Sequence, residues 1–170
     1  MMILNGYYFA ATGVSSHEFY RGDECACRVT QAGLPGEPLR VRAASGEEWA
    51  FMPSEATAPG AALPFLDADG HEAAQLCLWY DGYFAVAIPG AALTGRVIRS
   101  HLRRAILYAG IDEVVAVRLQ YGLDRAMARE KFGEWFPRRY VATVAEDIDP
   151  RLLALALAVP FLGIESIEVG

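Results

Sequence analysis

The sequence predicts a mainly β fold, a closed or nearly closed antiparallel barrel that wraps a hydrophobic C-terminal helix. Residues 152–164 (LLALALAVPFLGI) form an uncharged apolar run between Arg151 and Glu165. Most of the chain before residue 148 has the pattern of short strands separated by turn signals. A helix that is apolar on every side must be surrounded by protein, and a ring of strands can surround it. The alternative fold is an α+β sandwich in which this helix covers one face of a sheet.

The expected strands combine aromatic or alternating residues with turns that contain glycine. Asp69-Gly70 and Asp81-Gly82 are the strongest hairpin signals, and Ser45-Gly46 marks a further turn. The strands expected around them are 7–9, 19–20, 39–42, 49–51, 73–80, 83–88, 114–121 and 139–144. Residues 53–64, rich in Ala, Pro and Gly, predict a loop. Residues 93–108 fit either a helix or strands, and we favour strands.

The C-terminal helix is expected over residues 149–163. Asp149 is a good N-cap, and Pro150 suits the first turn, where a backbone N–H has no partner within the helix. Pro160 lies near the end of the helix, and Gly163 is a candidate C-cap. The side chains that should be buried, on opposite sides of this helix, are Leu153, Leu155, Leu157, Val159 and Phe161.

Composition predicts a single globular domain over residues 1–170. Hydrophobic residues make up 54% of the chain, which argues against intrinsic disorder. The net charge of −6 argues against a nucleic-acid partner. Three cysteines are too few, and odd in number, for a disulfide framework, so we expect a cytoplasmic protein. No apolar run reaches the length of about 20 residues that a membrane helix needs, so membrane association would be peripheral.

The C-terminal third resembles the Tubby-like superfamily, which includes the LURP-one-related proteins and the phospholipid scramblases. The resemblance rests on YVATV at 140–144, DIDP at 147–150, the apolar helix, and FLGIE at 161–165. The segment FLDADGHE at 65–72 is similar to the strand–Asp–Gly–strand hairpins of this group. The resemblance implies a barrel around a hydrophobic helix, and a basic groove for phosphoinositides. No Cys-rich palmitoylation cluster or Pro-rich arm of the scramblase kind is present in the sequence.

Arginines gather in the stretch RVIRSHLRR at 96–104. On a strand, Arg99, His101 and Arg103 would share one face. We take Arg99, Arg103 and Arg104 as a candidate site for a phosphorylated or lipid ligand, because guanidinium groups bind phosphate with two hydrogen bonds. The alternative is a solvated surface whose charge is offset by acids such as Asp112 and Glu113. A second and weaker basic patch is Arg138-Arg139.

The sequence contains no recognised catalytic motif, so no catalytic residue, cofactor or metal is assigned. The function expected is a non-enzymatic binding or scaffold domain, with an anionic lipid, a phosphorylated ligand or a protein as partner. The alternative is a small hydrolase or isomerase that uses His71 with Asp67 or Asp69, although these aspartates also flank a glycine turn. Cys25 and Cys27 should project from the same side of a strand. They lack a second pair of zinc ligands, so we expect both in the core.

Overall fold

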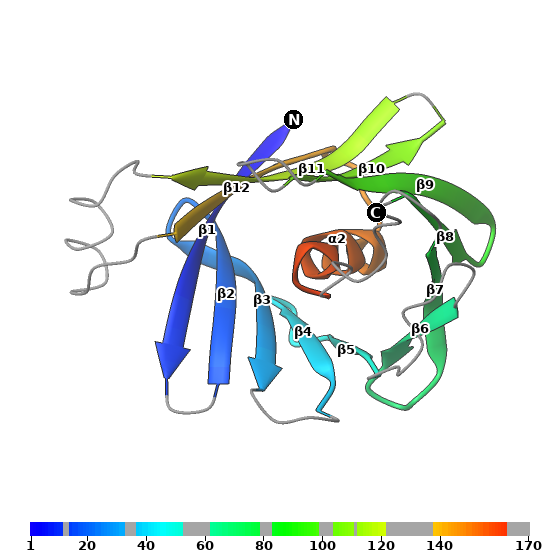
Figure 1. Ribbon diagram of the computed structural model, residues 1–170, viewed down its shortest axis with the longest axis horizontal. Coiled ribbons are helices and arrows are strands. Elements are labelled where there is room, and N and C mark those ends of the chain that lie inside the picture. The colour runs from blue at the N-terminus through cyan, green and yellow to red at the C-terminus, as the bar shows by residue number, and fades with distance from the viewer. Residues whose placement is uncertain are drawn as a thin grey trace, which may run out of the picture.

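Twelve antiparallel strands close into a barrel, and the C-terminal helix lies inside the ring that they form (Figure 1). This computed structural model describes residues 1–11, 14–32, 37–52, 62–78, 83–98, 104–110, 112–121 and 138–162. The barrel that the sequence predicts is confirmed, and the sandwich alternative is wrong.

Each strand pairs with the strand that follows it in the sequence, and β12 pairs with β1 to close the ring. The strands are β1 (Met2–Ala11), β2 (Val14–Arg21), β3 (Glu24–Ala32), β4 (Leu39–Ala43), β5 (Glu48–Phe51), β6 (Ala62–Asp67), β7 (Glu72–Leu78), β8 (Tyr83–Ile88), β9 (Ala91–Ile98), β10 (Arg104–Ala109), β11 (Asp112–Tyr121) and β12 (Arg138–Val144). Closure leaves none of the twelve described strands at an open sheet edge.

Alternating burial along the strands separates an apolar inner wall from a polar outer wall. In β4, Leu39 and Val41 are buried while Arg40 and Arg42 are exposed. The loop expected over residues 53–64 is wrong for its last three residues. Ala62–Pro64 belong to β6, where the same alternation buries Leu63. Residues 53–61 lie outside the described part of the chain. The strands favoured within residues 93–108 are confirmed as β9 and β10, while residues 99–103 between them are not described.

Glycines with positive φ make the hairpin turns that the sequence predicts. Gly46 has φ +90° between β4 and β5, and Gly70 has φ +81° between β6 and β7. Side chains other than glycine rarely adopt this backbone conformation, so both turns depend on the glycine. The expected Asp81-Gly82 turn lies outside the described residues.

The apolar run forms a helix, α2 (Pro150–Ala158), that continues as one 3-10 turn, η2 (Val159–Phe161). The α-helix therefore ends earlier than residue 163. Pro160 explains this, because proline has no N–H to donate to the carbonyl four residues earlier and its ring clashes with that carbonyl. Gly163, the expected C-cap, is outside the described residues.

The helix is buried around most of its circumference, as an element inside a barrel must be. Leu155, Leu157 and Ala158 have no exposed surface, and Val159 and Phe161 are also buried. Leu153 is only half-buried, so the expectation that it would be fully buried is wrong. It lies near the exposed Pro150, at the end of the helix that reaches solvent.

Aromatic rings hold the end of the helix against the barrel wall. The His17 ring from β2 stacks on Phe161, with centroids 3.6 Å apart and an angle of 13° between the planes. Tyr140 from β12 meets both rings edge-on. Gln31 Nε2 on β3 donates a hydrogen bond of 3.3 Å to the Phe161 carbonyl oxygen. Three strands thereby fix the position of η2.

We expect the Asp149 cap to contribute to stability in a pH-dependent way. Asp149 Oδ1 accepts hydrogen bonds from the backbone N and the Nε of Arg151 at 2.9 and 3.1 Å, and Oδ2 accepts from Nη2 at 2.7 Å. The side-chain bond from Arg151 is the main cause that lowers the pKa of Asp149 below its ordinary value of 3.8. The stabilisation is therefore present above that value and is lost as the pH falls through the lower folded-state pKa.

Asp149→Ala should lower the free energy of unfolding by about 1 kcal/mol near neutral pH, measured by urea denaturation. Asp149→Asn is the matched control, because it keeps a capping oxygen but removes the charge. It should retain most of the stability near neutral pH and remove the contribution of this residue to the acid dependence. A loss with Asn as large as with Ala would contradict the assignment of the effect to the cap.

Candidate functional site

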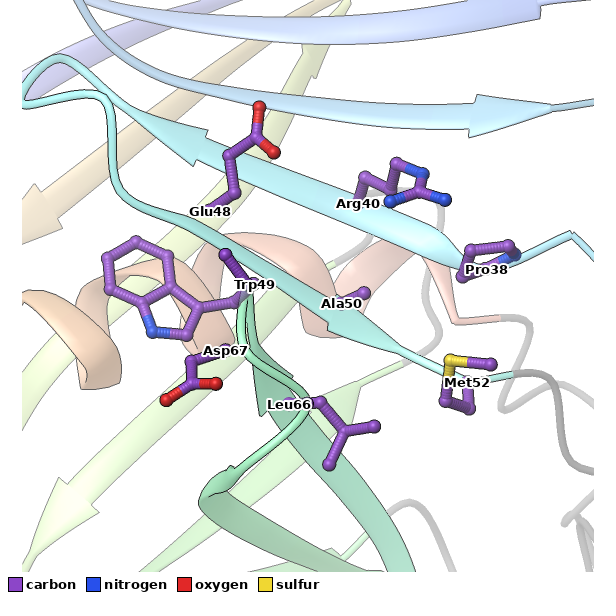
Figure 2. A pocket seen from close by; sticks show the side chains of 10 residues that line it. Pro38, Arg40, Glu48, Trp49, Ala50, Met52, Leu66 and Asp67 are labelled. Carbon is purple, nitrogen blue, oxygen red and sulfur yellow. The ribbon is translucent and has the colours of Figure 1, made fainter.

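The structure has an open groove of about 350 Å³ over β4, β5 and β6 on the outer wall of the barrel (Figure 2). Its centre is one row of cross-strand partners, in which Arg40 pairs with Ala50 and Ala50 pairs with Leu66. Their strand neighbours Leu39, Val41, Phe51 and Phe65 face the core, so this row faces outward. The methyl side chain of Ala50 leaves a hollow between two larger residues.

The ends of the groove differ in chemistry. Figure 2 shows Arg40 with Pro38 and Met52 toward one end, and Trp49 with Asp67 toward the other. Met52 is 45% exposed, so its apolar side chain is available to a ligand in the groove. The sequence indicated that Arg40 would face outward, because residues 39–42 alternate. It did not indicate the groove, because the pairing of three strands was unknown.

Asp67, Asp69 and His71, the candidates for an enzyme, lie together at the β6–β7 turn. Asp67 Oδ1 accepts hydrogen bonds from the backbone N of Asp69 at 3.0 Å and of His71 at 2.9 Å. The His71 side chain is 82% exposed, and its Nδ1 is 4.0 Å from Asp67 Oδ2, too far for a hydrogen bond. The carboxylate thus stabilises the turn, and the exposed imidazole lacks the orientation that a general base receives from its partner.

The same three side chains are the group of possible metal ligands found within the described residues. Their ligand atoms lie within 4.8 Å of one another, and Asp69 and His71 are exposed. The backbone hydrogen bonds to Asp67 account for the position of that carboxylate without a metal.

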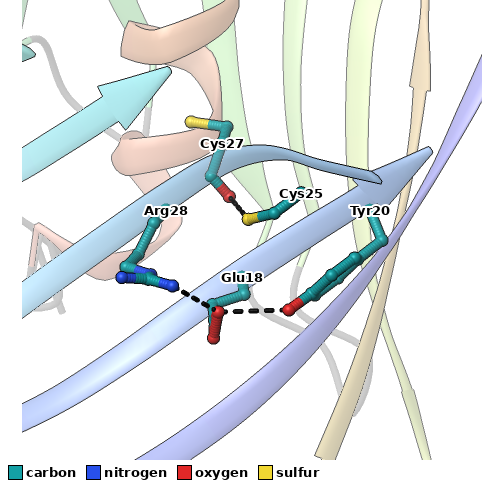
Figure 3. A network of polar contacts seen from close by, with 5 residues as sticks. All are labelled: Glu18, Tyr20, Cys25, Cys27 and Arg28. Atoms are coloured by element: carbon teal, nitrogen blue, oxygen red, sulfur yellow. Dashed lines mark hydrogen bonds and ion pairs between the residues drawn. The ribbon is translucent and has the colours of Figure 1, made fainter. Parts of the chain in front are cut away.

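A polar network lies on the outer wall where β2 and β3 pair (Figure 3). Glu18 Oε1 accepts hydrogen bonds from Arg28 Nη2 at 2.9 Å and from the Tyr20 hydroxyl at 3.2 Å. Glu18 points outward, because its strand neighbours His17 and Phe19 face inward. Its side chain is nevertheless buried. The ion pair with Arg28 compensates for the burial of this carboxylate.

Cys25 belongs to this outer network, so the prediction that both cysteines lie in the core is wrong for Cys25. The register pairs Phe19 with Cys27 and Tyr20 with Cys25, so Ala26 is an extra residue, a β-bulge. The bulge turns Cys25 to the outer face beside Tyr20, while Cys27 stays in the core (Figure 3). The two thiols therefore do not share a face of the strand.

Burial favours the protonated form of three groups in this region, Tyr20, Cys25 and Cys27. It raises the pKa of Tyr20 to about 12, with a further contribution from the Glu18 charge. It also raises the pKa of the half-buried Cys25 thiol, and that of Cys27 to about 12. A thiol is nucleophilic as the thiolate, so neither cysteine is activated for chemistry near neutral pH.

Of the predicted anion site, Arg99 and Arg103 lie outside the described residues, as does His101. Arg104 is the first residue of β10, and its cross-strand partners are Ile98 of β9 and Arg118 of β11. Arg118 was not a candidate in the sequence analysis, because it lies 14 residues further along the chain. Only the register brings it beside Arg104.

Arg96, at the start of the same arginine stretch, is half-buried on β9. Its Cζ lies 4.7 Å from the centroid of the Tyr83 ring on β8, an arrangement typical of a cation–π contact. Its Nε is buried and has no hydrogen-bond partner among the residues that the structure describes.

Asp112 and Glu113, the acids expected to offset the arginines, lie at the far end of the β10–β11 hairpin. Asp112 pairs with Ala109 and Glu113 with Tyr108. Ala109 is five residue steps from Arg104 along β10, which corresponds to about 17 Å, and Tyr108 is four steps away, about 14 Å. The backbone positions of these two acids are therefore several residues away from that of Arg104 along the sheet.

Comparison of the chain with protein-family models, curated proteins and solved structures gave no match. The Tubby-like resemblance stays a prediction. Among the residues that the structure describes, no helix has the length and hydrophobicity that a membrane span requires.

Proposed function

We propose that this chain is a non-enzymatic binding domain of the Tubby-like kind, which binds a phosphorylated or lipid anion on its outer surface through Arg99, Arg103 and Arg104. The observation that carries the proposal is the position of α2. The helix lies inside the ring of strands (Figure 1), and its residues Leu155, Leu157 and Ala158 have no exposed surface. We therefore expect a ligand to bind on the outer wall.

The placement of the arginines supports an anionic ligand. Residues 99–103 connect β9 to β10, and the next residue, Arg104, is directly opposite Arg118. Like charges at directly opposite positions destabilise a sheet unless an opposite charge offsets them. A bound phosphate would supply that charge.

The test is co-sedimentation with vesicles of phosphatidylcholine alone and with phosphatidate added. We expect binding to the phosphatidate vesicles at low salt, and weaker binding at physiological salt, where screening shortens electrostatic reach to about 8 Å. Changing Arg99, Arg103 and Arg104 together to Ala should abolish binding. Arg42→Ala is the control, because Arg42 is an exposed arginine on β4, six strands around the ring from β10.

Inorganic tripolyphosphate distinguishes a soluble phosphorylated ligand from a lipid. Competition by tripolyphosphate would indicate that phosphate groups alone are recognised. Equal binding to phosphatidylcholine vesicles, or no binding to phosphatidate vesicles at low salt, would contradict the proposal.

A further inference from the structure

We propose that the groove over β4, β5 and β6 binds a small single-chain amphiphile with one anionic head group. The head group would contact Arg40, and the apolar chain would lie over Ala50, Met52 and Leu66. This site is independent of the proposed arginine site, since β4 and β10 are on opposite sides of the ring.

The first observation is that the charge of Arg40 is available. Arg40 is exposed and lines the groove, and it makes no ion pair or side-chain hydrogen bond in the part of the chain described here. Its strand neighbour Arg42, two residues on, pairs instead with Glu48 at 3.8 Å.

The second observation is that both carboxylates of the groove already have partners. Glu48 faces Arg42, and Asp67 Oδ1 accepts the two backbone N–H groups of its own turn. Asp67 also lies toward the other end of the groove from Arg40 (Figure 2). The end that contains Arg40 therefore favours an anion.

The third observation is the apolar surface beside that guanidinium. Met52 is 45% exposed, while Pro38, Ala50 and Leu66 are half-buried, so an alkyl chain laid across them would remove apolar area from water. Methionine adapts its shape to a flexible chain. The volume of about 350 Å³ lies at the lower end of the range for small-molecule sites.

The guanidinium of Arg40 determines which head groups fit the site. A guanidinium presents a planar fork of N–H donors that matches two oxygens of a carboxylate or a phosphate. Octanoate and octyl phosphate both carry such oxygens on an apolar chain. Titration with each ligand shows which anion is preferred.

The experiment is calorimetric titration of the full chain with octanoate and octyl phosphate below their micelle-forming concentrations. The NMR signal of the Met52 methyl group, identified with a Met52→Leu variant, reports the location of the ligand. We expect either anion to shift this signal. Arg40→Ala should weaken binding about tenfold, the usual effect of losing a charge-assisted pair.

Two variants and two ligands make the test specific. Ala50→Leu fills the hollow and should reduce binding, provided that circular dichroism shows the barrel intact. Arg21→Ala, which removes an exposed arginine at the end of β2 outside the groove, should bind as the wild type does. Octanol, which lacks the charge, and acetate, which lacks the chain, should both bind more weakly than octanoate.

Three results would overturn the proposal. One is full affinity in a folded Ala50→Leu protein, and another is equal affinity for octanol and octanoate. The third is tighter binding of octylamine, which would mean that Glu48 and Asp67 determine the charge preference. None of these results depends on the vesicle assay, so the two proposals can fail separately.

Discussion

Replacing Leu155 with Asp is expected to abolish folding of the barrel. Leu155 has no exposed surface and lies in α2, inside the ring of strands. An aspartate there would be either an unpaired charge in an apolar interior or a protonated acid without adequate partners, and both cost several kcal/mol. A domain of this size has a total stability of only about 5–15 kcal/mol, so the loss is comparable with the whole.

Circular dichroism and the dispersion of amide NMR signals would measure the outcome. Leu155→Ala should remain folded and lose about 2–5 kcal/mol, because it leaves a cavity but buries no polar group. Thr94→Asp is the matched control, since Thr94 is exposed on β9 and should tolerate a charge. A well-folded Leu155→Asp protein would contradict the enclosure of the helix.

The fold was predictable because its main signals are local. The uncharged run after Arg151 required an enclosing structure, and the alternation in residues 39–42 assigned one face of β4 to the core. Asp149 and Pro150 marked the start of the helix through hydrogen bonds that span only two residues. Such features depend on nearby residues alone.

Features that depend on register were not predictable in the same way. The bulge at Ala26 changes the face of Cys25, and no feature of the sequence around it signals an extra residue. Ala62–Pro64 looked like part of a loop by composition, but packing of Leu63 in the core makes them part of β6. Tertiary packing outweighed local preference at both places.

The candidate sites were likewise predictable where they depend on local sequence, and not where they depend on strand register. The turn-stabilising role of Asp67 follows from the Asp–Gly pattern and was one of the two roles considered for it. The hollow at Ala50 depends on which residues β4 and β6 place on either side, and the pairing of Arg104 with Arg118 depends on the β10–β11 register. A single sequence does not contain those alignments in any local signal.

Adding a single methyl group at Gly95 on β9 should have a large effect on the stability of the barrel. A Cβ at this residue would overlap the ring of Phe84 and would lie 2.8 Å from the Ile106 carbonyl oxygen. Phe84 is the cross-strand partner of Gly95 and is 3% exposed, so its ring fills the space that the glycine leaves. The absence of a side chain at Gly95 is therefore part of the packing between three strands.

Gly95→Ala should lower the free energy of unfolding by about 3 kcal/mol, measured by urea denaturation, because overpacking in a dense core forces side chains and backbone to shift. Phe84→Leu combined with Gly95→Ala should recover part of the loss by removing the ring atoms. Recovery should remain incomplete, since the Ile106 carbonyl belongs to the backbone and cannot be trimmed. Gly90→Ala provides the control: Gly90 has φ +85° and open space around it, so strain alone should cost about 1 kcal/mol. A loss at Gly95 no larger than at Gly90 would contradict the contact with Phe84.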